Sequence, residues 1–295
     1  MFVGTRQFQF TDHEAGVSFP VLVMYPTAQP AVSTAFGPYV MDVSPDAPVA
    51  QGVYPLVIVS HGSGGSHLLY RSITMHLARN GYIVAMLEHA GNNRLDNQFQ
   101  GKIQNLQYRP RHVTLTIDGI LADPELSRHS QQHHVAIIGH SMGGYTALAI
   151  AGGQPWYPPD QLQPEQLHTA QQVEVEHDPR VGVLVLLAPA TPWYMPEGAL
   201  SRVDLPILML TAEHDPYTPQ WHADIVLNGV PDREKVTFRE VKNAGHFSFL
   251  SPFPPKIQSG GSLPTIDPEG FDREQFHEQL KVELLAYLNL KLKTT

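Results

Sequence analysis

Short apolar segments alternate along this chain with longer segments in which apolar residues recur every three or four positions. The short segments have the length and the β-branched residues of buried strands, whereas the longer ones have the spacing of amphipathic helices. This alternation is typical of an α/β fold in which helices cover both faces of a mostly parallel sheet. The predicted strands cover residues 17–25, 54–60, 82–87, 135–138, 181–187, 207–210 and 236–241.

The ends of the predicted helices are marked by glycine and proline. A helix with apolar residues at positions 69, 73 and 77 stops at Gly81, because glycine readily adopts the backbone conformation that closes a helix. Pro110 suits the first turn of the next helix, where the N–H that proline lacks would have no partner. Thr218 and Pro219 mark the start of a later helix, and Gly229 closes it. Two further helices are predicted for residues 142–151 and 272–291.

Two long segments lack either periodicity and are predicted to be loops. Residues 26–51 are rich in Pro, Ala and Ser, and residues 154–180 contain prolines, glutamines and acids. We interpret 154–180 as an insertion that can cover a site at the edge of the sheet. No other break divides the pattern, so a single domain is predicted for residues 1–295.

A serine lies in a glycine-rich turn between a predicted strand and an Ala- and Leu-rich helix. The turn reads Gly139-His140-Ser141-Met142-Gly143, and a Gly-x-Ser-x-Gly pattern at such a corner is a nucleophile elbow. The two glycines remove Cβ atoms that would collide as the chain doubles back. A glycine-flanked serine alone is an ordinary turn, but here both the strand before it and the helix after it are present. Ser141 is therefore the predicted nucleophile.

A serine hydroxyl needs a general base and a carboxylate that orients the base. His246 follows the last predicted strand, on a loop that can reach over the strand ends, and is the predicted base. The acid is expected after the preceding strand, where Glu213 and Asp215 both occur. Asp215 is favoured because it lies further into the loop, and Glu213 stays the alternative. The resulting chain order of serine, acid and histidine is the one found with a nucleophile elbow.

Acyl transfer to a serine also needs two backbone N–H donors for the oxyanion of the tetrahedral intermediate. One belongs to the residue after the nucleophile, Met142. The other is expected in the glycine-rich turn after His61 and Gly62, where Ser63 is the predicted donor and Gly64 the alternative. The glycines of this turn could instead cradle a phosphate, but no Gly-Lys-Ser/Thr sequence follows them, which argues against a P-loop.

The composition excludes several functional classes. The net charge is -9 and no basic cluster could neutralise a phosphate backbone, so no nucleic-acid partner is expected. The chain contains no cysteine, which excludes disulfides, thiolate zinc sites and cysteine nucleophiles. His129, His133 and His134 lack carboxylates at ligand spacing and are interpreted as part of a solvated loop. Neither a metal nor another cofactor is expected.

The expected location follows from the absence of targeting signals. The N-terminal residues lack the basic start and apolar core of a signal peptide, and no apolar stretch is long enough to span a bilayer. We therefore expect a cytoplasmic protein without a membrane span, as a monomer or a small homo-oligomer.

Taken together, these motifs resemble those of α/β-hydrolases, and most nearly the branch that contains platelet-activating-factor acetylhydrolase-like and dienelactone-hydrolase-like esterases. The resemblance covers most of the chain, from roughly residue 15 onward. The elbow is strongly specific for the superfamily and only weakly specific for substrate. The residues that carry the resemblance are Ser60-His61-Gly62-Ser63-Gly64-Gly65, Gly139-His140-Ser141-Met142-Gly143-Gly144, Glu213-His214-Asp215 and Gly245-His246-Phe247.

The resemblance implies an α/β-hydrolase fold and a serine carboxylesterase that hydrolyses small-molecule esters of short to medium acyl length through an acyl-serine intermediate. Dienelactone hydrolases use a cysteine nucleophile, so that activity is not expected here. Few residues separate the strands at 181–187 and 207–210, so the large helical cap of many lipases is expected to be absent. Tyr70, Trp193 and Phe247 are then predicted to contact the substrate, with core or loop packing as the alternative for Tyr70 and Trp193.

Two other functions stay open on the sequence alone. An amidase or peptidase would use the same triad and differ only in how well the leaving amine is protonated. A non-catalytic binding protein of the same fold would be expected to lack at least one triad residue, and none is missing here.

Overall fold

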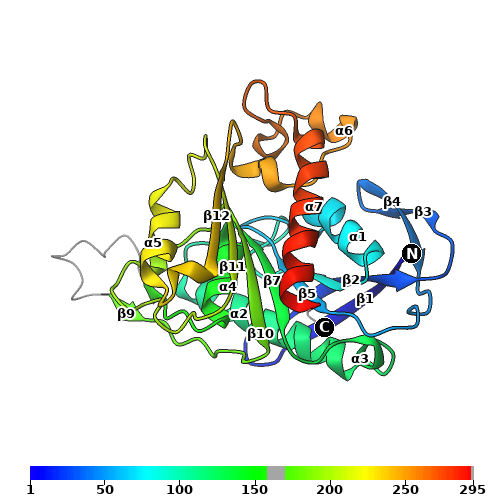
Figure 1. Cartoon of the computed structure of the whole chain (residues 1–295), viewed down its shortest axis with the longest axis horizontal. Coiled ribbons are helices and arrows are strands. Elements are labelled where there is room, and N and C mark those ends of the chain that lie inside the picture. The colour runs from blue at the N-terminus through cyan, green and yellow to red at the C-terminus, as the bar shows by residue number, and fades with distance from the viewer. Residues whose placement is uncertain (158–169, 294–295) are drawn as a thin grey trace.

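The computed structural model describes residues 1–157 and 170–293, and its central feature is a ten-stranded mixed sheet (Figure 1). The strand order is β12-β11-β10-β7-β5-β6-β2-β1-β4-β3. The strands from β12 to β6 are parallel, and β2 pairs antiparallel with both β6 and β1. The strands are β1 (Phe2–Asp12), β2 (Val17–Thr27), β3 (Val32–Phe36), β4 (Tyr39–Pro45), β5 (Leu56–Ser60), β6 (Ile83–Leu87), β7 (Val135–His140), β10 (Val181–Leu187), β11 (Ile207–Ala212) and β12 (Val236–Val241).

The central strands are buried on both faces. Every residue of β5, β6, β7 and β11 is buried, and for this reason these strands read as continuous apolar runs in the sequence. All seven predicted strands are present, with bounds within two residues of the prediction.

Helices cover both faces of the sheet (Figure 1). Leu77 of α1 and Leu284 of α7 belong to the apolar core on one face, and α2, α4 and α5 contribute to the core on the other face. The predicted α/β architecture is thus confirmed. No described helix combines the length and apolar character needed to cross a membrane. The helices are α1 (Arg71–Arg79), α2 (Ile103–Ala122), α3 (Leu126–His129), α4 (Met142–Ile150), α5 (Trp221–Gly229), α6 (Pro255–Gln258) and α7 (Arg273–Leu292), with 3-10 helices η1 (His67–Tyr70), η3 (Pro192–Tyr194), η4 (Arg233–Lys235), η5 (His246–Phe249) and η6 (Leu263–Thr265).

The N-terminal edge of the sheet differs from the prediction. The loop predicted for residues 26–51 contains the hairpin of β3 and β4, which turns at Gly37 with a φ of 56°. No strand was predicted for β1, which pairs with β2 along its whole length. These strands lie at the edge of the sheet and are only partly covered, so polar residues alternate with the buried ones and weaken the apolar signal.

The second helix also differs from the prediction, because Pro110 lies inside α2 rather than in its first turn. A proline in a helix cannot donate to the carbonyl four residues earlier. That carbonyl belongs to Leu106, and it accepts a hydrogen bond of 2.9 Å from the Tyr145 hydroxyl on α4. A tertiary contact thus satisfies the acceptor that Pro110 leaves free.

The segments between the C-terminal strands determine how the sheet edge is covered. Residues 188–206, between β10 and β11, contain only the short helix η3, so the predicted absence of a large cap is confirmed there. In the insertion predicted for 154–180, residues 158–169 lie outside the described residues. Its described ends pair as the short strands β8 (Trp156–Tyr157) and β9 (Gln171–Gln172).

Candidate active site

The turn at Ser141 joins β7 to α4 with an unusual backbone conformation. The φ of Ser141 is 54°, in the left-handed region that side chains rarely adopt. A Cβ atom at Gly139 would collide with the Gly143 backbone, and one at Gly143 would collide with the carbonyl of Ser60. The close approach of β7, α4 and β5 therefore requires both glycines. The local geometry is that of the elbow predicted from the sequence.

The predicted acid and base meet in the loops that follow β11 and β12. His246 Nδ1 lies 2.6 Å from Asp215 Oδ2, although the two residues are far apart in the sequence. The His246 ring packs against the ring of His140, the residue before Ser141, with 4.9 Å between centroids. Asp215 and His246 are both buried. The structure therefore brings the carboxylate and the imidazole together next to the elbow.

The carboxylate of Asp215 is held by three further donors. Its Oδ1 accepts from the N–H groups of Tyr217 and Thr218, and its Oδ2 accepts from the Thr218 hydroxyl at 2.6 Å. Burial alone would raise the pKa of Asp215, but the hydrogen bonds from His246 and Thr218 outweigh it and lower that pKa to about 2. Thr218, predicted to cap α5, therefore supports Asp215 instead, and α5 is preceded by Gln220.

The alternative acid, Glu213, has other partners. Its Oε2 accepts from the N–H of Asn243 at 2.7 Å, and its Oε1 lies 3.3 Å from Lys242 Nζ. Lys242 is exposed, so this pair lies at the surface. The geometry favours Asp215 over Glu213 as the partner of the histidine.

The two predicted oxyanion donors lie on adjacent segments. A Cβ atom at Gly62 would be 3.2 Å from the Cβ of Ser141, so the loop that contains Ser63 approaches the elbow closely. Within the described residues, neither the Ser63 N–H nor the Met142 N–H donates a hydrogen bond. Both groups are therefore available to an oxyanion.

His140 and Tyr70 connect the oxyanion loop to the loop of His246. The Tyr70 hydroxyl accepts from the Gly62 N–H at 3.3 Å and lies 2.9 Å from His140 Nδ1. His140 Nε2 lies 3.0 Å from the carbonyl of His246. Burial lowers the pKa of His140 to about 3, so its imidazole is neutral at physiological pH. This chain of contacts fixes the base loop relative to the Gly62 turn.

The three residues predicted to contact substrate have different surroundings. Tyr70 is 1% exposed, and its contacts favour support of the loop over contact with a ligand. Trp193 is half-buried against Tyr145, with 4.9 Å between ring centroids. Phe247 is half-buried beside His246, at 5.1 Å, and Tyr217 lies 5.4 Å from Phe247. Tyr217, which the sequence did not single out, is 51% exposed next to the histidine.

Comparison with known proteins places the fold. A family model for platelet-activating factor acetylhydrolase, isoform II, matches residues 13–117. The chain is 22% identical over 204 residues to a cutinase from Thermobifida alba, a match that covers 68% of this chain and 56% of the cutinase. A solved ferulic acid esterase from Streptomyces cinnamoneus superposes with a TM-score of 0.73 at 17% identity, covering 99% of this chain and 90% of the esterase.

A dienelactone hydrolase-like promiscuous phosphotriesterase from metagenomic libraries superposes with a TM-score of 0.61 at 14% identity, over 98% of this chain and 99% of that enzyme. The chain has the α/β-hydrolase fold. The family match confirms the predicted resemblance to platelet-activating factor acetylhydrolase over residues 13–117, and the dienelactone hydrolase-like neighbour is similar in fold. The family match includes the loop of Ser63 but ends before Ser141.

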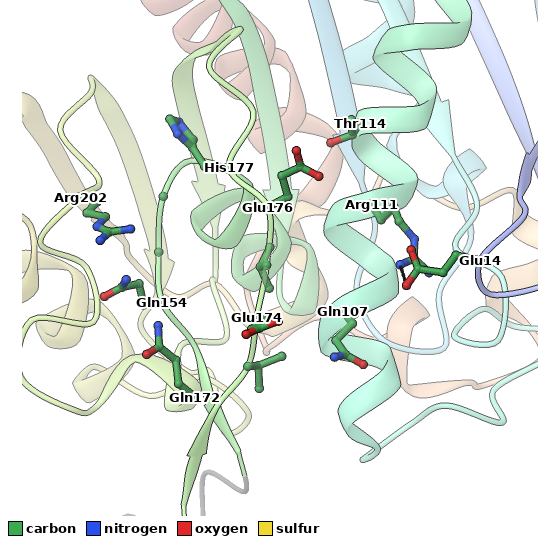
Figure 2. Close-up of a pocket in the computed structure, with 14 residues that line it drawn as sticks. Glu14, Gln107, Arg111, Thr114, Gln154, Gln172, Glu174, Glu176, His177 and Arg202 are labelled. Carbon is green, nitrogen blue, oxygen red and sulfur yellow. Dashed lines mark ion pairs between the residues drawn. The ribbon is translucent and has the colours of Figure 1, made fainter.

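The structure also contains a cleft, and none of the predicted site residues lies in its lining. Gln107, Arg111 and Thr114 of α2 face residues 172–177 across it (Figure 2). Polar and charged side chains predominate in its lining, including an ion pair of 2.7 Å between Arg111 and Glu14. Its lining includes Gly152, just after the end of α4 opposite to Ser141, so it is separate from the candidate catalytic residues. No group of three or more potential metal ligands occurs among the described residues.

Proposed function

We propose that this chain is a serine carboxylesterase that hydrolyses carboxylic esters of short to medium acyl length. The observation that carries the proposal is the 2.6 Å contact between Asp215 and His246 beside the strained turn of Ser141. A buried carboxylate on Nδ1 keeps the proton on that nitrogen, so Nε2 is free to act as a base. The cutinase and ferulic acid esterase that this chain resembles are named as ester-hydrolysing enzymes, in agreement with this assignment.

In the first half of the reaction, the Ser141 hydroxyl attacks the ester carbonyl carbon and passes its proton to His246. The carbonyl oxygen becomes an oxyanion, which accepts hydrogen bonds from the N–H groups of Ser63 and Met142. When the carbon–oxygen bond to the leaving group breaks, His246 gives its proton to the departing alkoxide. The products are an alcohol and an acyl group on Ser141.

In the second half, water attacks the acyl-serine while His246 takes one of its protons. The second tetrahedral intermediate is held by the same two N–H groups, and its collapse returns the proton to Ser141. The carboxylic acid is released. No step needs a metal or a redox cofactor.

The acyl range is proposed from the surroundings of His246. Phe247 and Tyr217 present aromatic surface beside the imidazole, and residues 188–206 add no helical cap over the sheet. Aromatic surface beside the base, without a cap above it, favours contact with acyl chains of a few carbons. The apolar core on one face includes residues as far apart as Val3 and Leu292, which supports a single domain for the chain.

The experiment that tests the function combines a covalent probe with a substrate panel. A fluorophosphonate should label the wild type but not Ser141→Ala, and Ser141→Ala should lose about 10⁶-fold in kcat on p-nitrophenyl butyrate. Equal labelling of the two proteins would contradict the assignment of the nucleophile. An ester should be cleaved much faster than the amide of the same acid, and comparable rates would favour the amidase alternative.

A further inference from the structure

Arg109 of α2 is a buried cation close to the candidate oxyanion hole. Its side chain is 0% exposed, and it is among the largest fully buried side chains of the protein. Within residues 1–157 and 170–293, no carboxylate forms an ion pair with it, and its hydrogen bonds go to uncharged oxygen acceptors. Burial lowers the pKa of Arg109 to about 9, so the guanidinium is still protonated at neutral pH. A buried cation without a counter-ion is costly, and its presence therefore requires an explanation.

The guanidinium of Arg109 forms hydrogen bonds with the loop that contains Ser63, directly and through Asn92. Its Nη1 donates to Asn92 Oδ1 at 2.7 Å, and Asn92 Nδ2 donates to Ser63 Oγ at 2.9 Å. Arg109 Nη2 donates to the carbonyl of His61 and to Ser60 Oγ. These hydrogen bonds fix the chain at Ser60 and His61, before Ser63, and also fix the side chain of Ser63 through Asn92.

The same guanidinium also reaches the other donor segment. Its Nε donates to Thr146 Oγ1 on α4 at 3.0 Å. The Thr146 hydroxyl in turn donates to the carbonyl of Met142, also at 3.0 Å. One planar group thus connects the two segments that carry the free N–H groups of Ser63 and Met142. An arginine can do this because its five N–H donors are fixed in one plane.

We propose that Arg109 is a positioning residue that holds the two halves of the oxyanion hole at a fixed separation and adds an uncompensated positive charge behind them. This role rests on the proposed esterase function. The ester substrate is neutral, whereas the tetrahedral intermediate carries a negative charge, so a fixed cation in the interior favours the intermediate over the substrate. The effect of Arg109 should therefore fall on kcat more than on KM.

Two substitutions separate position from charge. Arg109→Lys keeps the charge but cannot serve Thr146, Asn92 and His61 together, and Arg109→Gln removes the charge as well. We expect kcat on p-nitrophenyl butyrate to fall about 10-fold in Arg109→Lys and about 100-fold in Arg109→Gln, with KM changed by less than about twofold. The affinity for an alkyl boronic acid, which becomes an anionic adduct of Ser141, should fall in parallel with kcat.

The matched control is Arg111→Gln, which lies two residues further along the same helix and pairs with the buried carboxylate of Asp12 and the exposed carboxylate of Glu14. It should keep the kcat and the boronic acid affinity of the wild type. If the Arg109 variants do not fold, Thr146→Val cuts only the connection to Met142, and it should lower kcat about fivefold with KM unchanged.

The inference is overturned if folded Arg109 variants keep the wild-type kcat and boronic acid affinity, or if they raise KM with kcat unchanged. Wild-type kcat in Thr146→Val would overturn it equally when the Arg109 variants cannot be obtained. Either result leaves the esterase proposal intact as long as the wild type is active and Ser141→Ala is not. An active Ser141→Ala protein would instead overturn the proposed function itself.

Discussion

The candidate site has an acid–base side, with Asp215 and His246, and an oxyanion side, with Arg109 and the N–H groups of Ser63 and Met142. The two sides differ in whether their buried charge has a partner. On the acid–base side, the carboxylate of Asp215 is paired with His246 and receives three more hydrogen bonds. On the oxyanion side, the guanidinium of Arg109 donates hydrogen bonds to neutral acceptors, with no carboxylate among its partners in the described part of the chain. A group that stabilises a transient imidazolium must be an anion, whereas a group that favours a transient oxyanion works best as a cation without a partner. Each side thus carries the charge opposite to the one that develops next to it.

The largest effect on this comparison is expected from the acid. Asp215→Asn should lower kcat about 10⁴-fold, because an amide stabilises the wrong tautomer of His246 while leaving the geometry almost unchanged. Glu213→Gln is the matched control and should stay within about twofold of the wild type, since its carboxylate faces Asn243 and Lys242. Steady-state kinetics on one ester measure both. A silent Asp215→Asn together with an inactive Glu213→Gln would assign the acid to Glu213.

The two sides also differ in how far the sequence predicts them. Ser141, Asp215 and His246 each follow a predicted strand of a mostly parallel sheet, and the carboxyl ends of parallel strands lie at one edge of the sheet. Arg109 has no motif, and its partners come from three separate segments, at Ser60 and His61, at Asn92 and at Thr146. One signal was present, because Arg109 lies on the apolar stripe of its helix with Val113 and Ile117. A charged residue at a core position is an indication of a functional or structural polar network.

The fold shows the same division between local and tertiary information. Continuous apolar runs predict the central strands within two residues, because burial on both faces leaves no room for polar residues. Helix α2 is mispredicted because the partner of the Leu106 carbonyl, Tyr145, is remote in sequence. The capping role predicted for Thr218 fails for a similar reason, since its hydroxyl is used by Asp215. In both cases the prediction from local helix rules fails because another side chain provides the hydrogen-bond partner.

The next prediction concerns Tyr70, which lies between the two sides. Tyr70→Phe removes the hydroxyl that accepts from Gly62 N–H and contacts His140, so a buried donor loses its partner. We expect a loss of about 1–3 kcal/mol in the free energy of unfolding and a decrease in kcat with KM unchanged. Urea denaturation and ester kinetics measure these changes. An increase in KM at unchanged stability would instead support the substrate contact predicted from the sequence.

A smaller effect is expected from pH, because both sides contain buried imidazoles. Burial lowers the pKa of His61 and His112 on the oxyanion side to about 3, and that of His277, behind the loop of His246, to about 4. Between pH 6.5, the ordinary pKa of histidine, and pH 4, these imidazoles are protonated in the unfolded chain but neutral in the folded protein. Their contribution to the free energy of unfolding is therefore fully present above pH 6.5 and is lost as the pH falls. Asp215 extends the loss below pH 4, since its folded pKa is about 2.

One substitution tests this linkage. His277→Gln removes a single group whose pKa is lowered by folding, so the slope of unfolding free energy against pH near pH 5 should decrease by about 1.4 kcal/mol per pH unit. Urea denaturation at half-unit steps from pH 7 to pH 4.5 measures the slope. His13→Gln, at an exposed position, is the control. An unchanged slope in His277→Gln would mean that this histidine is protonated in the folded protein.

The smallest effect is expected at the aromatic residues beside His246. The aromatic rings of Phe247 and Tyr217 lie beside His246, and neither side chain forms a hydrogen bond among the described residues. If they contact the acyl chain, replacing either with alanine should reduce the preference for butyrate over acetate esters about threefold, because each buried methylene contributes about 0.8 kcal/mol. The ratio of kcat/KM for the two esters measures this preference.

Trp193→Phe provides the contrast, since Trp193 packs against Tyr145 of α4. It should change the stability of the fold more than the ratio between the two esters. If the alanine variants at 217 and 247 keep the wild-type ratio while Trp193→Phe lowers it, the acyl chain lies toward α4 and η3 rather than beside the base. The acyl-binding surface would then belong to the oxyanion side, and only proton transfer would remain on the side of Asp215 and His246.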